Sequence, residues 1–186
     1  MTDATLLTDR KRPAVRLERH LSDPPEIVWR ALTERDQLRS WFPSDVVVSG
    51  GRWEVGAAIT FEFPPEVIDM TLTGEVLEVD EPNLLVFTWG DETLRFELSR
   101  EDDGTRLVLI DELPAGVAAR NAAGWDVCLD RLADLKQGVD VWQSRFEAAW
   151  QSRFENYVAA FEPELGPQEG PRAGYKGGEP ERPART

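Results

Sequence analysis

A long series of strand-like segments, followed late in the chain by one amphipathic helix, most strongly constrains the fold. Apolar and polar residues alternate from Val15 to Leu21 and from Ile59 to Phe63, as expected for strands that bury one face. Further strand-like segments cover residues 46–49, 53–55, 72–79, 84–89, 94–98 and 106–110. The connections between the segments are short, which favours sequential antiparallel hairpins over parallel strands joined by crossover helices.

The helix expected from Gly124 carries an apolar stripe on one face. Trp125, Leu129 and Leu132 recur at the spacing of an amphipathic helix. A segment of small residues, beginning at Pro114, leads from the last strand into it. One late helix must therefore cover a large antiparallel sheet, and such an arrangement tends to enclose a groove.

We expect one globular domain with extensions at both ends. Residues 1–12 are predicted to be a disordered leader, residues 13–138 the domain, and residues 163–186 a disordered tail rich in Pro, Gly and charge. Residues 139–162 are predicted to form an amphipathic helix with an aromatic stripe and a repeated Trp-Gln-Ser-Arg-Phe motif. This stripe either packs back on the domain, forms a homodimer interface or binds another protein.

Composition excludes several classes of partner. The chain carries 35 acidic and 21 basic residues, a formal net charge of −14, which repels phosphate backbones and anionic lipid surfaces. We therefore expect no nucleic-acid partner and no membrane partner. Its single cysteine excludes an internal disulfide, and its start has no signal-peptide core, so we expect a cytoplasmic protein.

Few residues could support catalysis. The single histidine, His20, has the parity of the polar side of its strand, and a multi-histidine metal centre is impossible. Cys128 lies beside the apolar stripe and is expected to be a packed thiol. No phosphate-binding glycine loop is present, because Gly50-Gly51 fits a hairpin turn. We expect no metal and no cofactor, and this inventory favours a non-enzymatic role.

Four motifs together resemble those of the SRPBCC superfamily, also called START-like or Bet-v-type helix-grip proteins. Within it, the chain is most similar to the bacterial branch that resembles the activator of heat-shock-protein-90 ATPase. The motifs occur in the family's order over about residues 14–138, at residues 24–42, 74–80, 85–89 and 104–132. They include the Pro24-Pro25-Glu26-Ile27-Val28-Trp29 and Gly124-Trp125 sequences.

The resemblance implies an α+β helix-grip fold. A curved seven-stranded antiparallel sheet would surround a long C-terminal helix, with two short helices after strand 1. Some members are cyclases or hydratases, and the activator itself works with a chaperone. A histidine often follows the last strand in this branch, and Asp111 stands there instead.

Strand parity indicates which side chains line the groove. The expected ligand pocket consists of Ile59, Phe61, Phe63, Phe87, Trp89, Leu94, Phe96, Leu107, Leu109, Asp111, Trp125, Leu129 and Leu132. A small apolar or aromatic ligand would gain about 25 cal/mol for each Å² of apolar surface buried there. Alternatively, these large side chains simply fill a core.

Asp111 is the one acidic residue whose parity points it into the groove. Buried, it could anchor a ligand or act as a general acid, whereas at the strand end it could simply be solvated. The first hypothesis is therefore a non-enzymatic protein that binds a small apolar ligand. The alternatives are a protein-interaction or chaperone-linked module, a homodimer built on the 139–161 helix, and an enzyme that uses Asp111.

Overall fold

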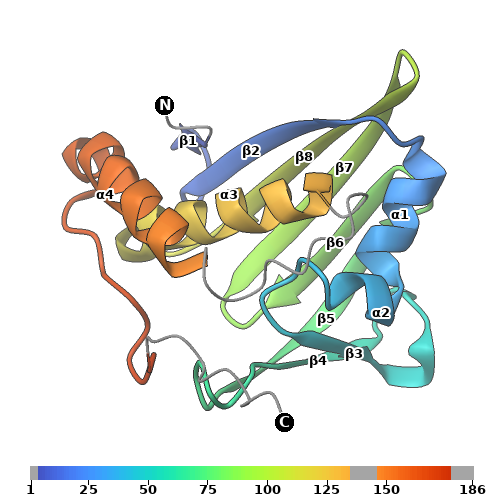
Figure 1. Ribbon diagram of the computed structural model, residues 1–186, viewed down its shortest axis with the longest axis horizontal. Helices are drawn as coiled ribbons and strands as arrows, with labels where there is room; N and C mark the ends of the chain where they lie inside the picture. Colours follow the sequence, from blue (N-terminus) through green and yellow to red (C-terminus); the bar gives the residue numbers. More distant parts are fainter. Residues whose placement is uncertain (1–3, 135–145, 177–186) are drawn as a thin grey trace, which may run out of the picture.

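The computed structural model describes residues 4–134 and 146–176 and shows an α+β fold with one antiparallel sheet. Eight strands follow the order β1-β2-β8-β7-β6-β5-β4-β3. Figure 1 shows the sheet curving around helix α3, with α1 and α2 at one end and α4 at the other. The strands are β1 (Thr5–Leu7), β2 (Ala14–Leu21), β3 (Asp45–Val48), β4 (Ala58–Glu62), β5 (Thr71–Asp80), β6 (Leu84–Trp89), β7 (Glu92–Glu101) and β8 (Gly104–Glu112).

The helix-grip fold is confirmed, with one strand more than expected. Seven strands correspond to predicted segments, and the eighth, β1, lies in the predicted disordered leader. It pairs with the free edge of β2, where Leu6 lies opposite Val15. The leader prediction is therefore wrong for Thr5–Leu7, because an unpaired sheet edge provides backbone partners for this apolar segment.

Residues 53–55, predicted as a strand, form a loop instead. The 3₁₀ turn η1 (Ser49–Gly51) precedes them, and Gly50, Gly51 and Gly56 all have positive φ angles, which break the ladder around this segment. The Trp53 indole donates a 2.9 Å hydrogen bond to the carbonyl of Thr33, so this loop packs on the end of α1.

Two short helices, α1 (Pro25–Thr33) and α2 (Arg35–Leu38), cover one end of the sheet. Pro24 and Pro25 occupy the N-cap and the first helical position, where the missing amide hydrogen costs nothing. The Trp41 indole donates a 2.8 Å hydrogen bond to the carbonyl of Ala31, which fixes the segment after α2 against α1.

Helix α3 (Ala118–Asp134) begins earlier than the sequence predicts, directly after the 3₁₀ turn η2 (Ala115–Val117). The small-residue segment before Gly124, which was predicted to be a linker, forms the first turns of this helix. Ala118, Ala119 and Ala122 are fully buried there. Alanine favours helix formation, and its small side chain allows the backbone to approach the sheet closely.

Helix α4 (Phe146–Leu165) packs along α3. The prediction of an aromatic helix over 139–162 is testable only from Phe146, because residues 139–145 lie outside the described part of the chain. The expected disordered tail is ordered as far as the description extends. The helix continues past Pro163, and residues 166–176 then cross the molecule. Neither α4 nor any other described helix is long and apolar enough to span a membrane.

Candidate functional site

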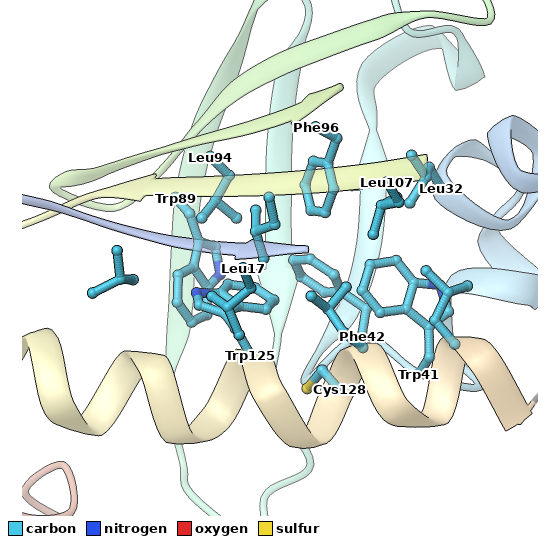
Figure 2. Packing of buried hydrophobic residues seen from close by; sticks show 14 of the residues in the cluster. Leu17, Leu32, Trp41, Phe42, Trp89, Leu94, Phe96, Leu107, Trp125 and Cys128 are labelled. Carbon is cyan, nitrogen blue, oxygen red and sulfur yellow. The ribbon is translucent and has the colours of Figure 1, made fainter. Parts of the chain in front are cut away.

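The concave face of the sheet and the facing stripe of α3 form the centre of the molecule. The strand register aligns inward positions in rows, so that Leu85 lies opposite Phe96 and Phe96 opposite Leu109. Twelve of the thirteen predicted pocket residues are buried here, and Phe63, at the rim, is partly buried. Figure 2 shows Leu94, Phe96 and Leu107 pointing from the sheet toward Trp125 and Cys128 on α3. The parity argument therefore places these side chains correctly.

Aromatic rings occupy the space between sheet and helix. Phe42, from the segment after α2, lies at the centre of this cluster, and its ring centroid is 5.4 Å from that of Trp125 and 6.1 Å from that of Phe61. Phe87 stacks on both Phe61 and Phe96, with centroids 5.9 Å away in each case. The sequence analysis did not assign Phe42 to the groove, because that position depends on how the loop after α2 folds back.

The middle of the groove is closely packed. Phe42, Phe61 and Leu109 expose 1% of their surface or less, and Phe87 and Trp125 expose 2%. A space large enough for water beside these rings would leave accessible surface on them. A ligand would therefore have to enter at an end of the groove.

One end of the groove contains a buried polar cluster around Asp111. One carboxylate oxygen, Oδ2, accepts hydrogen bonds from Nε1 of Trp125 at 2.8 Å and from Nδ2 of Asn121 at 3.0 Å. The same Asn121 amide donates to Oε2 of Glu92 at 2.8 Å. Asp111 is fully buried and Glu92 is 5% exposed, so the idea of a solvated Asp111 at the strand end is wrong.

Glu92 and Asn121 were missed by the sequence analysis, although both positions carry a signal. Glu92 precedes Leu94 and Phe96 with the same parity on β7, so Asp111 is not the one inward acid. Asn121 lies one helical turn before Trp125 on α3.

Burial changes the chemistry of this acidic pair. Loss of hydration raises the pKa of Asp111 well above its ordinary value, and the nearby Glu92 carboxylate raises it further. Burial likewise raises the pKa of Glu92, against the attraction of Arg172. Two close carboxyl groups of this kind favour holding a shared proton or binding a hydrogen-bond donor.

Three buried polar atoms at this end lack a hydrogen-bond partner among the described residues. They are Oδ1 of Asp111, Nε1 of Trp89 and Nε of Arg120. The Trp89 and Trp125 rings are in contact, with centroids 5.2 Å apart, and the Trp125 indole binds Asp111 directly. Asp111 and Trp89, which both contact Trp125, therefore each carry an unsatisfied buried polar atom, which is costly for a folded protein unless something else binds it.

The C-terminal strap, residues 166–176, covers this end of the molecule. Its Glu169 amide donates a 2.7 Å hydrogen bond to the carbonyl of Gly116, just before α3. Farther along, the amide of Lys176 donates a 2.9 Å hydrogen bond to the carbonyl of Val67, in the loop between β4 and β5. Between these anchors, the guanidinium carbon of Arg172 lies 5.3 Å from the centre of the Trp89 ring.

The two residues first considered for nucleophilic or acid–base chemistry lie away from this cluster. His20 is on the outer side of β2, 67% exposed, with Nδ1 2.8 Å from a carboxylate oxygen of Glu101. Cys128 is buried in α3, and burial raises the pKa of its thiol to about 12. The thiol is therefore protonated and unreactive at neutral pH. No group of three or more potential metal ligands occurs within residues 4–134 and 146–176.

The described half of the aromatic stripe packs back onto the domain. Tyr157 and Phe161 are buried, and Trp150 and Phe154, stacked at 4.9 Å, lie partly buried against the core. The Tyr157 hydroxyl donates a 2.9 Å hydrogen bond to Oδ2 of Asp126 on α3. Most of this apolar surface is therefore already used within one chain.

Comparison with known proteins agrees with this fold. The family model of "Activator of Hsp90 ATPase homolog 1-like protein" matches residues 22–137. EF2215 from Enterococcus faecalis, a conserved protein of unknown function, is 25% identical with a TM-score of 0.68, over 84% of this chain and 91% of that one. CalU16 from Micromonospora echinospora is 20% identical with a TM-score of 0.66, over 84% and 92%.

A third structure, MLL2253 from Mesorhizobium loti, is 25% identical with a TM-score of 0.58, over 69% of this chain and 99% of that one. No functionally curated protein matches the chain. The family match spans more than half of the sequence and covers α1, α2, strands β3 to β8 and α3. The chain therefore belongs to the family of Activator of Hsp90 ATPase homolog 1-like proteins, with an SRPBCC-type helix-grip domain.

Proposed function

We propose that this protein binds a small apolar or aromatic molecule at the Asp111 end of the groove between the sheet and α3. One observation carries the proposal: Oδ1 of Asp111 is fully buried and has no hydrogen-bond partner within the described chain. Leaving a buried acceptor unpaired costs about 1–3 kcal/mol, which a ligand that donates a hydrogen bond would recover.

The surroundings of Asp111 indicate the chemistry of the ligand. The Trp89 and Trp125 rings provide apolar faces beside the carboxyl group. Nε1 of Trp89 offers a donor, so a hydroxyl group that both donates and accepts would suit the pair. The ligand would thus be an apolar or aromatic body with one small polar end, held by few polar contacts as in most small-molecule sites.

Titration with naphthalen-2-ylmethanol tests this proposal. The indole N–H signals of the seven tryptophans are observed in nitrogen–proton NMR spectra of the labelled protein. We expect saturable shifts of the Trp89 and Trp125 signals, and little change for Trp53, which lies on the end of α1 and bonds to Thr33.

Paired variants and a paired ligand isolate the role of Asp111. Because burial raises the pKa of Asp111, the comparison is made at a pH high enough to ionise this carboxyl group, so that Oδ1 is an acceptor only. Asp111→Asn places an amide donor there, so the alcohol should bind about tenfold more weakly, the loss of one buried hydrogen bond. Its methyl ether, which cannot donate, should lose nothing from this substitution. Asp134→Asn is the control, because it makes the same substitution at an exposed position of α3. Tryptophan signals that do not shift, in the full-length protein, would refute the proposal.

A further inference from the structure

The strap brings a positive charge to the end of the groove where the ligand is proposed to bind. The Arg172 guanidinium lies over the face of Trp89, 5.3 Å from the ring centre, and Nη2 is 3.5 Å from Oε1 of Glu92. An aromatic face and a carboxylate are the two groups that proteins use to hold organic cations. The Glu92 side chain is only 7% exposed, so its attraction for a cation is weakly screened by water.

The Glu92 carboxylate belongs to the same network as the unsatisfied oxygen of Asp111. The amide of Asn121 donates to both carboxyl groups, at 2.8 Å and 3.0 Å. Among the described residues, Arg172 makes the one ion pair with this acidic pair. The cluster therefore has an acidic pair and an aromatic face, and the cation that contacts both comes from the strap.

The strap is attached to the rest of the molecule by hydrogen bonds and ion pairs rather than by buried apolar side chains. None of its residues is fully buried. Side-chain contacts of Gln168 with Ala115 and Ala119, at 3.1 Å and 3.0 Å, supplement its backbone anchors. A segment with few buried apolar contacts opens at low free-energy cost compared with the core.

A second arginine, Arg120, repels Arg172 electrostatically. The side chain of Arg120, 13% exposed, lies at the same end, and its charge and that of Arg172 repel each other. Arg120 has its own carboxylate partner, Glu169, at 3.5 Å. The strap arginine is thus held by Glu92 and Trp89 but repelled by a neighbour, as expected for a contact that a better-fitting cation can replace.

We infer that Trp89 and Glu92 form a subsite for an organic cation, an ammonium group on an apolar or aromatic body, and that Arg172 occupies this subsite as an internal competitor. The inference rests on the proposed function, because the body of the ligand would lie in the groove beside Asp111. Binding would displace Arg172 and lift the strap, and the strap would in turn select for ligands that carry a positive charge.

Naphthalen-2-ylmethylamine, a cation at neutral pH, and the neutral naphthalen-2-ylmethanol provide a matched pair of probes. Arg172→Gln removes the competing charge but keeps a long polar side chain. We expect this variant to bind the ammonium probe at least fivefold more tightly than the wild type does, with less than a twofold change for the alcohol. Arg52→Ala, a substitution of an 81% exposed arginine in the loop before β4, should change neither affinity.

Glu92→Gln in the Arg172→Gln background should abolish the gain for the ammonium probe, since the carboxylate is its counter-charge. As a second measurement, a saturating ammonium probe should speed the cleavage of wild-type protein by trypsin after Arg172. An unchanged affinity of Arg172→Gln for the ammonium probe, or an equal gain for both probes, would overturn the inference. If the alcohol still binds, the proposed function survives that failure; if neither probe binds either protein, both fail.

Discussion

Asp111 shows how one residue can make the stability of this protein depend on pH. Because burial raises its pKa, the folded protein holds a proton that the unfolded chain releases at pH values above about 4. Stability should therefore fall as the pH rises through this window, by about 1.4 kcal/mol for each unit by which the pKa is raised. Asp111→Asn is neutral throughout, so its unfolding free energy should vary less between pH 5 and pH 8.

Urea unfolding at a series of pH values measures this difference. Glu92 titrates together with Asp111, so the variant should show a shallower slope rather than none. Asp134→Asn, exposed at the end of α3, should keep the wild-type slope. An equally steep fall in Asp111→Asn would mean that the buried carboxyl group does not hold the extra proton.

Two glycines show how differently single elements tolerate the same substitution. A Cβ atom on Gly74, in β5, would lie 1.9 Å from the carbonyl oxygen of Thr88 on the neighbouring strand, so Gly74→Ala must move the backbone. We expect this variant to lose about 2 kcal/mol or more, as for other overpacked positions. A Cβ atom on Gly124, inside α3, would meet nothing within 4 Å.

Gly124→Ala should therefore stabilise the protein, by up to about 1 kcal/mol, through helix propensity alone. Thermal unfolding of the two variants beside the wild type tests the pair, with opposite shifts of the melting temperature expected. Shifts in the same direction would show that the β5–β6 contact does not have the described geometry.

At the level of elements, the sequence predicted what depends on local periodicity. Alternation placed Phe61, Phe96 and Leu109 on the inner face, and helical spacing placed Trp125 opposite them. Tertiary contacts decided the rest. The ring of Phe42 fills the groove because the segment after α2 folds back over the sheet, and no local pattern reports that path.

Across the whole molecule, the two ends of the chain were the least predictable parts. β1 lies within the mostly polar residues 1–12 and gains its partners from β2, and the strap is rich in Pro and Gly. Both look disordered by composition, since neither could be stable alone. The candidate site shows the same division. Asp111 was found by parity, whereas Arg172 comes from far along the chain and reaches the site by a path set by α4.

One hydroxyl group connects three distant parts of this molecule. Tyr157 on α4 donates a 2.9 Å hydrogen bond to Asp126 on α3 and accepts a 3.0 Å hydrogen bond from the amide of Ala4, next to β1. Tyr157→Phe keeps the buried ring but leaves the Ala4 amide without this acceptor. Arg19 still pairs with Asp126, so the helix pair should stay folded while the protein loses about 1–3 kcal/mol.

The loss should be uneven along the chain, because β1 has only one strand neighbour whereas α3 lies in the core. Hydrogen exchange of the full-length protein should quicken most at residues 4–7, less in α4 and least in the central strands β7 and β8. Glu155→Gln, on an exposed turn of the same helix, should leave this pattern unchanged. Uniform quickening would instead mean that β1, α3 and α4 unfold as one unit, with the Tyr157 hydroxyl contributing to global stability.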